Sequence, residues 1–441
     1  MSLGSLKQKI DRQEARLAVI GLGYVGLPLA CTFAQKGFNV LGVDIVEDRI
    51  QKINAGLSPI EGKEPGLADL IDSVVGQQKL RATSDYADLA DRDVILICVE
   101  TPVDDDHKPR YTALRAVLGS LGPVLKEGAL VIIESTIAPG TMNSLVKPLL
   151  EESSEKRLNQ DFFLGNCPER VMPGRLLANL REMSRVVGGM SPETAEAMVA
   201  LYAHFVEGDL DPTDATTAEL VKTAENAYRD VQIAFANEVA LISEAVGGDV
   251  WKVRELVNKS PGRNMLLPGA GVGGHCIPKD PWLLAYGVEG RDVPIRLIPA
   301  ARTTNEYMPL HVADLLEEAL AQAGQTIKNS RILVLGYAYL ENSDDTRDTP
   351  SEKFVAELGR RGAEAVLHDP YVEDYQGDLL AKAQGCAAAV LMVKHDEYAE
   401  LDFEALRNQL SADIFIDARG LFAQKQAIEG FAFEVIGRGR K

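Results

Sequence analysis

One cysteine in this 441-residue chain lies in a setting that suits a nucleophile. Cys276 follows the glycine-rich stretch 269–274, and Asp280 comes four residues after it. Glycines let a backbone approach a ligand closely and adopt positive φ, so they expose the sulfur and place amide N–H groups beside it. Because a thiolate attacks carbonyl carbons readily, the sequence predicts covalent catalysis at Cys276. The alternative is a buried cysteine in a turn, which is common for an intracellular cysteine.

A second pair of polar residues precedes this stretch. Lys222 and Asn226 are four residues apart in 215–247, where a continuous helical pattern ends at two glycines. Residues at this spacing share one helix face, so the two side chains are either a solvated pair or part of the Cys276 site. The adjacent cysteine stretch favours the second interpretation. A helix of this length spans about 50 Å, and we expect it to link two domains and to form a dimer through an exposed apolar face.

The beginning of the chain predicts a dinucleotide site. An apolar run enters Gly21-x-Gly23-x-x-Gly26, an apolar-periodic helix follows, and the next apolar run ends at Asp44. In this strand–turn–helix order the first glycine forms the tight turn, the second admits a pyrophosphate and the third lets helix and strand pack closely. Asp44 would accept hydrogen bonds from a ribose and repel a 2′-phosphate, which favours NAD over NADP. The alternative is an ordinary βαβ unit with a solvated Asp.

Further apolar runs alternate with helical patterns, as expected for parallel strands covered by helices on both faces. They are 93–99, 129–135, 162–166 and 184–188 in the first half, and 331–336, 363–369, 387–393 and 413–417 in the second. Ligands in such sheets bind beyond the carboxyl ends of the strands. Thr101, Thr136 and Glu169 follow these ends and are candidates for one crevice, although loops also use such residues for capping. The second series lacks the glycine fingerprint, but its opening turn is polar and contains Arg347.

Composition excludes several classes of protein. The formal net charge of −19 opposes nucleic-acid binding, and the absence of a long apolar run or signal peptide predicts a cytoplasmic protein without a membrane span. Five cysteines without CxxC spacing argue against a disulfide framework or a zinc site, so no metal is expected. The length suggests two or three domains. The polar segment 1–14 is expected to fray.

Several separated motifs together resemble the UDP-glucose/GDP-mannose dehydrogenase family of nucleotide-sugar 6-dehydrogenases. The resemblance covers nearly the whole chain. Its motifs are Gly21-Leu-Gly-Tyr-Val-Gly-Leu-Pro28, Ser135-Thr136, Pro168-Glu169-Arg170, Lys222 with Asn226, Gly273-Gly274-His275-Cys276 with Lys279-Asp280, and Asp344-Asp-Thr-Arg347. The stretch from Gly271 to Trp282 looks more like the branch that acts on UDP-N-acetylhexosamines than like the UDP-glucose branch. UDP-N-acetylmannosamine is the favoured substrate, followed by UDP-N-acetylglucosamine and then UDP-glucose.

The resemblance implies an α/β fold with two Rossmann-like doubly wound domains joined by a central long helix. It implies an NAD-binding domain over 1–210, a central helical linker and dimerisation domain with the cysteine loop over 211–323, and a UDP-sugar-binding domain over 324–441. A homodimer or higher homo-oligomer is expected, as is a role in making uronic acids for polysaccharides.

The resemblance also implies roles for individual residues. The reaction would be a four-electron oxidation of C6, with two NAD+ and a Cys276 thiohemiacetal and thioester. Catalytic roles fall on Cys276, Lys222, Asn226, Asp280, Glu169 and Thr136. Cofactor-binding roles fall on Gly21, Gly23, Tyr24, Val25, Gly26, Asp44, Arg49, Thr101, Thr136 and Arg347. Substrate-binding roles fall on Glu169, Arg170, Lys222, Asn226, Arg263, Gly273 and His275.

Two positions depart from the family pattern. Leu340 stands where the family commonly has Lys, and the Arg expected to reach a neighbouring subunit's substrate is shifted by one position, to Arg263. Two other functions compete with the favoured one. The first is a two-electron alcohol or hydroxy-acid dehydrogenase, which would leave Cys276 without a role. The second is a nucleotide-sugar-binding protein without catalysis, which would be expected to lack Cys276, Lys222 or Asp280.

Overall fold

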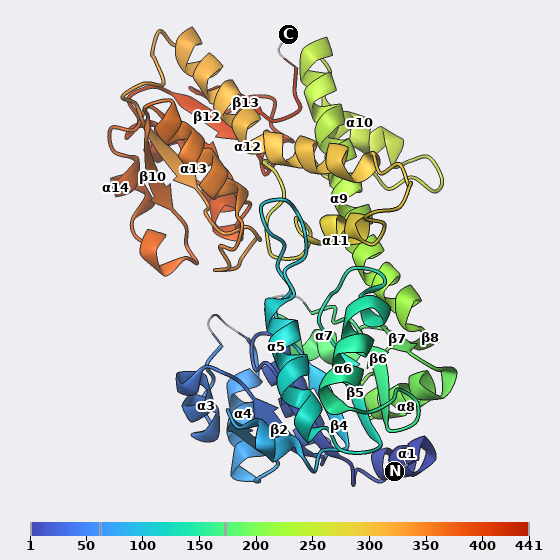
Figure 1. Cartoon of the computed structure of the whole chain (residues 1–441). Helices are drawn as coiled ribbons and strands as arrows, with labels where there is room; N and C mark the ends of the chain where they lie inside the picture. The colour runs from blue at the N-terminus through green and yellow to red at the C-terminus, as the bar shows by residue number, and fades with distance from the viewer. Residues whose placement is uncertain (1, 61, 63, 172–173, 440–441) are drawn as a thin grey trace. The chain divides into compact units, whose positions relative to one another are not determined.

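The structure is a computed structural model that describes residues 2–60, 62, 64–171 and 174–439. It divides into two compact units, Met1–Glu225 with Trp282–Val293 and Asn226–Pro281 with Pro294–Lys441. The helix α9 (Ala215–Val246) contributes residues to both units (Figure 1). Each unit contains one sheet with helices on both of its faces. The prediction of two Rossmann-like domains and a long central helix is therefore confirmed.

The first unit contains an eight-stranded sheet in the order β3-β2-β1-β4-β5-β6-β7-β8. Its strands are β1 (Arg16–Ile20), β2 (Asn39–Val43), β3 (Leu80–Thr83), β4 (Val94–Ile97), β5 (Ala129–Ile133), β6 (Phe162–Asn166), β7 (Arg185–Gly189) and β8 (Leu210–Asp214). Its helices include α1 (Leu3–Asp11), α2 (Gly26–Gln35), α3 (Glu47–Asn54), α4 (Leu67–Gly76), α5 (Thr112–Leu121), α6 (Lys147–Ser154), α7 (Leu176–Glu182) and α8 (Pro192–Tyr202).

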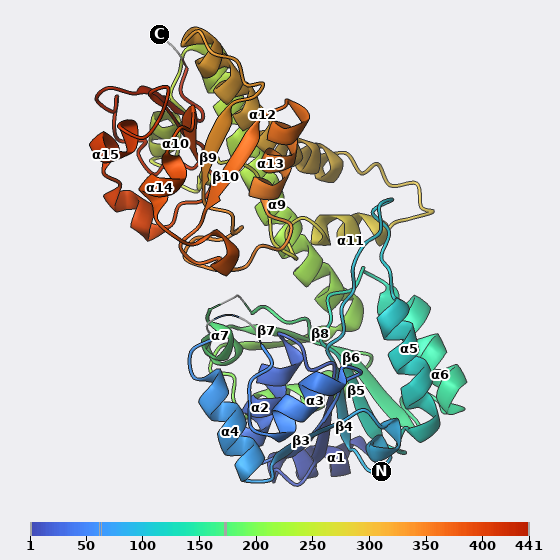
Figure 2. The same cartoon turned by 90° about the vertical axis from the view of Figure 1, so that its left-hand side faces the viewer.

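Side chains alternate between the two faces of this sheet. One face packs its residues against α1, α2, α4, α7 and α8, and the other packs the intervening residues against α5 and α6. Figure 2 shows α5 and α6 on one side of the strands and α2, α4 and α7 on the other. The apolar runs in the sequence are therefore continuous because both faces of the strands are buried.

Two expectations for the first unit are wrong. Segment 1–14 was expected to fray, but α1 forms and buries Leu6 and Ile10 completely, because these two apolar residues lie four apart on one helix face. The strand β7 was expected to be parallel to its neighbours, yet it pairs antiparallel with β6 through only two residue pairs. Strand β8 then pairs parallel with β7 along its whole length, which extends the sheet.

The second unit contains a parallel five-stranded sheet in the order β10-β9-β11-β12-β13. Its strands are β9 (Arg331–Leu335), β10 (Glu364–His368), β11 (Ala388–Leu391), β12 (Ile414–Asp417) and β13 (Ala432–Val435). Its helices are α10 (Val250–Val257), α12 (Leu297–Gln322), α13 (Pro350–Arg360), α14 (Leu379–Ala383) and α15 (Phe403–Arg407). Helices α12 and α13 cover one face, and α14 and α15 cover the other. No helix in the described ranges is both long and apolar enough to cross a membrane.

The two sheets share one local arrangement at the end of their first strand. Gly21 and Gly336 both have positive φ, 89° and 93°. The amide of the residue after each glycine donates to an Asp at the end of the adjacent strand: Leu22 to Asp44 at 2.7 Å and Tyr337 to Asp369 at 2.6 Å. The second sheet thus repeats the turn of the first, although its sequence lacks the glycine fingerprint.

Candidate active site

The three glycines of the first turn each meet a different steric demand. A Cβ on Gly21 would lie 2.5 Å from the carbonyl oxygen of Cys98, and a Cβ on Gly26 would lie 1.9 Å from the carbonyl oxygen of Gly21. A Cβ on Gly23 would have no protein atom within 4 Å. Gly21 and Gly26 are therefore required by packing, whereas Gly23 borders open space at the start of α2, where a pyrophosphate would need room.

Asp44 joins the end of β2 to this turn. Its Oδ2 accepts hydrogen bonds from the backbone of Leu22 at 2.7 Å and from Arg49 at 2.9 Å, and its Oδ1 accepts one from the backbone of Val46 at 2.9 Å. A carboxylate has about four lone-pair sites, so Asp44 retains capacity to accept from ribose hydroxyls. The Tyr24 hydroxyl donates to Glu64, while Val25 precedes the first turn of α2. This arrangement fits the adenosine half of NAD.

Thr101 and Thr136 lie together beyond the carboxyl ends of β4 and β5. The hydroxyl of Thr101 donates to the backbone carbonyl of Thr136 at 2.6 Å, and the hydroxyl of Ser135 donates to the carbonyl of Val99 at 2.6 Å. Thr101 is buried and Thr136 is half-buried. These hydrogen bonds join the loop that follows β4 to the loop that follows β5.

Glu169 belongs to a buried cluster of charged side chains. Its Oε2 lies 2.6 Å from Nη2 of Arg185, and its Oε1 accepts a hydrogen bond from the backbone of Arg170 at 2.6 Å. Arg185 also faces Glu134 at 3.5 Å, and the hydroxyl of Tyr202 donates to Glu134. Burial raises the pKa of Glu134, and the charge of Arg185 opposes this shift.

Lys222 lies on the first part of α9 and is only 9% exposed. In the part of the chain that the structure describes, its ammonium makes no hydrogen bond or ion pair within the protein. Glu219, three residues earlier, accepts hydrogen bonds from the backbone of Gly140 and of Met142, each at 2.7 Å. These bonds attach α9, which carries Lys222, to the loop that follows Thr136.

Asn226 and Asp280 form a pair in the second unit. The Asn226 amide donates to Oδ2 of Asp280 at 2.5 Å, and the Lys279 ammonium lies 3.2 Å from Oδ1. Asp280 is fully buried and begins α11 (Asp280–Tyr286). The amides of Lys279 and Asp280 both donate to the carbonyl of Cys276, at 3.1 and 2.9 Å. A tight turn therefore links Cys276 to Asp280.

Cys276 is exposed, whereas Cys31, Cys167 and Cys386 are buried and Cys98 is half-buried. The glycines before it pack on the turn that follows β9: a Cβ on Gly273 would lie 2.7 Å from the carbonyl of Asp348, and the amide of Gly274 donates to the carbonyl of Arg347 at 3.0 Å. The exposed thiol thus lies on a segment whose backbone is closely packed.

Arg347 lies in this turn and is oriented by Asp345. Its Nε donates to Oδ1 of Asp345 at 2.9 Å and its Nη2 to Oδ2 at 2.5 Å. Hydrogen bonding to Asp345 is the largest influence that raises the pKa of Arg347, and the charges of Asp345, Tyr339 and Cys276 act in the same direction. The cation and the thiol of Cys276 therefore influence each other electrostatically.

The remaining predicted residues are at the surface or outside these groups. Arg263 is exposed, and its Nη1 donates to the carbonyl of Pro261 at 2.8 Å. His275 is exposed next to Cys276. Arg170 donates to the carbonyl of Ser184 at 2.8 Å and to Glu225 at 2.5 Å. In the described chain, the side chain of Arg263 makes no hydrogen bond to the Cys276 segment.

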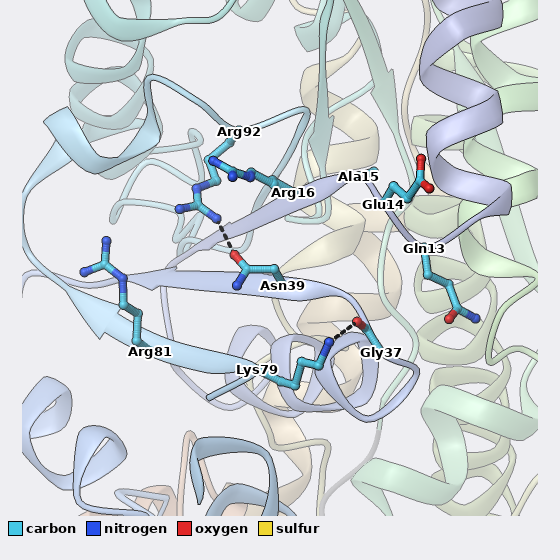
Figure 3. Close-up of a pocket in the computed structure, with 9 residues that line it drawn as sticks. All are labelled: Gln13, Glu14, Ala15, Arg16, Gly37, Asn39, Lys79, Arg81 and Arg92. Carbon is cyan, nitrogen blue, oxygen red and sulfur yellow. Dashed lines mark hydrogen bonds between the residues drawn. The ribbon is translucent and has the colours of Figure 1, made fainter. Parts of the chain in front are cut away.

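A cavity of about 420 Å³ lies at the opposite edge of the first sheet (Figure 3). It is lined by Gln13, Glu14, Ala15, Arg16, Gly37, Asn39, Lys79, Arg81 and Arg92. These residues lie at the amino-terminal ends of the strands, whereas ligands of such sheets bind at the carboxyl ends. Arg16 and Arg92 share the carboxylate of Asp91, and Arg81 is paired with Asp88, so two carboxylates offset part of the charge of these three arginines.

Comparison with known proteins identifies related families and structures. Models of the UDP-glucose/GDP-mannose dehydrogenase family match residues 15–206 as the NAD binding domain, 216–307 as the central domain and 333–424 as the UDP binding domain. A UDP-N-acetyl-D-mannosamine dehydrogenase of Pyrococcus horikoshii is 41% identical, over 96% of this chain and 99% of its own.

Two further relatives are similar over the same range. An NDP-N-acetyl-D-galactosaminuronic acid dehydrogenase of Ralstonia nicotianae is 36% identical, over 96% of this chain and 99% of its own. A solved structure of the Pyrococcus horikoshii UDP-D-ManNAc dehydrogenase superposes with a TM-score of 0.90 at 41% identity, covering 96% of this chain and 99% of that one. The resemblance identified from motifs in the sequence is thus confirmed by full-length similarity.

Proposed function

Since the chain belongs to the UDP-glucose/GDP-mannose dehydrogenase family and is an NAD-dependent nucleotide-sugar dehydrogenase, we propose that it oxidises C6 of UDP-N-acetylmannosamine to a carboxylate. One alcohol, one water and two NAD+ would give one carboxylate, two NADH and three protons. The proposal rests chiefly on the exposed thiol of Cys276, which a tight turn links to the buried pair Asn226 and Asp280.

The cofactor would be held by the glycine turn and by Asp44. Gly23 would leave room for the pyrophosphate at the start of α2, in a turn that Gly21 and Gly26 allow to pack closely. Asp44 would accept from the ribose, with Arg49 holding the carboxylate in place. Bound NAD+ supplies the hydride acceptor for each oxidation. Tyr24, Val25, Thr101, Thr136 and Arg347 would complete the contacts to it.

Cys276 would retain the substrate between the two oxidations. Its sulfur adds to the C6 carbon of the aldehyde, a C–S bond forms, and the carbonyl oxygen takes a proton to give a thiohemiacetal. That carbon still carries a hydrogen, so a second hydride can leave while the hydroxyl loses its proton, which yields a thioester. Water then adds to the thioester, the C–S bond breaks, and the carboxylate and the thiol are released.

Lys222, Asn226 and Asp280 would handle the charge and the protons at C6. The ammonium of Lys222, which is unpaired within the described protein, would stabilise negative charge on the reacting oxygen. The amide of Asn226 has a second hydrogen beyond the one given to Asp280 and would donate it to the same oxygen. Oδ1 of Asp280, which forms an ion pair with Lys279 at 3.2 Å, would accept the alcohol proton through a water.

Glu169 and Thr136 would act in hydrolysis. Glu169, which Arg185 holds in an ion pair at 2.6 Å, would orient the attacking water, and Thr136 would hold that water or the carboxamide region. Arg170, Gly273 and His275 would contact the substrate, and Arg263 would reach the substrate of a neighbouring subunit. We keep the three-part division of 1–210, 211–323 and 324–441 as part of the same proposal.

A homodimer would form through the exposed face of α9. Tyr228, Phe235 and Ile242 follow one another at intervals of seven residues and are 65%, 61% and 53% exposed. Side chains at this spacing form one stripe along a helix, the pattern that packs against a second helix. We propose that a second copy of this chain covers this stripe.

The experiment that tests the function counts NADH per sugar consumed. The purified protein is given UDP-N-acetylmannosamine, UDP-N-acetylglucosamine, UDP-glucose or GDP-mannose with NAD+. Two NADH per UDP-N-acetylmannosamine, with slower turnover of the other three, is the expected result. One NADH per sugar would instead support a two-electron dehydrogenase, and no turnover of any sugar would support a binding protein.

A further inference from the structure

A row of buried polar side chains runs between α9 and α12 in the second unit. Its members are Asp230 and Asn237 on α9 and Arg302 and Asn305 on α12, and each is at most 1% exposed. Figures 1 and 2 both show α12 alongside α9. We call these four residues the polar row. Charged and amide groups are costly to bury unless they are paired, so their presence between two helices requires an explanation.

The hydrogen bonds of the polar row run in one direction. The amide N–H of Gly269 donates to Oδ1 of Asn237 at 2.9 Å, and Nδ2 of Asn237 donates to Oδ1 of Asn305 at 2.9 Å. Nδ2 of Asn305 donates to Oδ1 of Asp230 at 2.7 Å, which Arg302 also contacts at 2.7 Å. A backbone N–H can only donate and a carboxylate can only accept, so the two ends fix the orientation of both amides.

One end of the polar row is the start of the cysteine segment. Gly269 precedes Cys276 by seven residues, and the other end of the segment is bonded through Asp280 to Asn226. Asn226, Asp230 and Asn237 are spaced by four and seven residues, which places them on one face of α9. Both ends of 269–280 are therefore attached to the same helix face.

The middle of the segment is also confined. A Cβ on Gly271 would lie 3.1 Å from the carbonyl oxygen of Asn305, and one on Gly273 would lie 2.7 Å from the carbonyl oxygen of Asp348. His275 and Cys276 are exposed within this confined stretch. Because the backbone of this segment is fixed, the sulfur of Cys276 is held close to one position, whereas a flexible loop would let it move between many.

We propose that Asn237 and Asn305 are positioning residues that fix the backbone of 269–280, and with it the reacting sulfur of Cys276. The catalytic part of this inference rests on the proposed function, whereas the ordering of the segment does not. Asn237 is the central member, because it accepts from the Gly269 amide and donates to Asn305. Without the amide of Asn237, the N–H of Gly269 and Oδ1 of Asn305 both lose their hydrogen-bond partner.

The test compares Asn237→Leu with the wild-type protein by hydrogen exchange and by kinetics. Leucine has the same number and branching of side-chain heavy atoms but neither donates nor accepts, so the 269–280 peptide should exchange at least about tenfold faster. The value of kcat should fall about tenfold and KM should change less than threefold, because orientation is lost but substrate contacts remain. Faster exchange with unchanged kcat would overturn the inference, and so would unchanged exchange.

Asn237→Asp provides a second variant if the leucine variant does not fold. Its carboxyl oxygen can still accept from Gly269, but only the protonated form can donate to Asn305. At alkaline pH, where the carboxyl is ionised, its kcat should therefore be lower than that of wild type, and the 269–280 peptide should exchange faster. Wild-type kcat and wild-type exchange at alkaline pH would contradict the proposed direction of the hydrogen bonds.

Asn258→Leu is the matched control for exchange. Asn258 also uses both amide atoms on a nearby backbone, accepting from the amide of Met265 at 2.7 Å and donating to its carbonyl at 3.1 Å. This variant should speed exchange around Met265 and leave 269–280 unchanged; equal acceleration of 269–280 would show that loosening is not specific to the polar row. Failure of the proposed function would already be visible in the NADH count of the wild-type protein.

Discussion

Asn226 donates a 2.5 Å hydrogen bond to Asp280, although 54 residues separate them in the sequence. This bond connects α9 to the end of the cysteine segment, and it orients a fully buried carboxylate whose other oxygen forms an ion pair with Lys279 at 3.2 Å. The position of the proton acceptor is thereby set by the same helix that carries Lys222. Substitutions at either residue should therefore affect catalysis more than folding.

Replacing Asp280 by Asn should lower kcat about 100-fold or more. The amide has nearly the same shape but cannot accept the alcohol proton, and general-base catalysis typically contributes a factor of this size. Steady-state NADH formation measures the effect. A loss of less than about threefold would show that another group accepts the proton.

Replacing Cys276 by Ser should abolish the second oxidation. The four-electron rate should fall at least about 1,000-fold, as expected when a covalent nucleophile is removed, while some aldehyde could form and be trapped with a hydrazine. Cys386→Ser is the control, because Cys386 is buried in the second sheet domain and donates to the carbonyl of Lys382, a bond that serine can keep. Two NADH per sugar from the Cys276 variant would remove the covalent mechanism.

Glu219 makes the stability of the first unit depend on pH. Burial raises its pKa from 4.5 to about 7, so between these values the folded chain binds more protons than the unfolded chain. The free energy of unfolding should therefore fall as the pH rises through this range, by up to about 3 kcal/mol from this group.

Thermal and denaturant unfolding of Glu219→Gln at about pH 5 and about pH 8 measures this contribution. Glutamine does not ionise, so the variant should lose less stability than wild type when the pH is raised. Glu196→Gln on the exposed face of α8 is the control and should follow wild type. Parallel behaviour of all three proteins would exclude Glu219 as the cause.

Asp44 should determine the cofactor preference. Asp44→Asn removes the charge that repels a 2′-phosphate, so the ratio of kcat/KM for NAD+ over NADP+ should fall at least about tenfold. Arg49→Gln should shift this ratio the other way, because it removes a cation beside the same position. An unchanged ratio in the Asp44 variant would mean that other contacts select the cofactor.

Phe235→Glu should dissociate the proposed homodimer. A charge in the middle of the exposed stripe on α9 would have to be buried at the interface, which is strongly unfavourable. Light scattering after size-exclusion chromatography measures the mass. Leu256→Glu changes another exposed apolar residue, on α10, and should leave the mass unaltered. A wild-type protein that is already monomeric would contradict the proposal directly.

The sequence was sufficient to predict features that depend on neighbouring residues. The turn at Gly21, Gly23 and Gly26, the long helix that became α9, and the exposed cysteine after a run of glycines all follow local patterns. The placement of Lys222 and Asn226 on one helix could also be predicted from their spacing alone.

Other features depend on residues that meet only in the fold. One example is Arg185, which forms ion pairs with Glu134 and Glu169, and another is Asn237, which accepts from the amide of Gly269. These partners come from distant parts of the chain, so their roles could not be recognised from the sequence. Glu219 could have been noticed, because it lies three residues before Lys222 on the same helix. The antiparallel pairing of β7 with β6 was missed because it involves only two residue pairs, and an apolar run in the sequence does not show the direction in which a strand pairs.

The contact between Gly274 and Tyr339 has a consequence for how relatives of this chain can diverge. Gly274 has a φ of +85°, and a Cβ there would lie 2.6 Å from the Tyr339 ring. The positive φ strains any residue that carries a Cβ, and the Tyr339 ring occupies the space that the Cβ would need. Over evolutionary time position 274 should therefore remain glycine even in relatives where position 339 carries a smaller side chain.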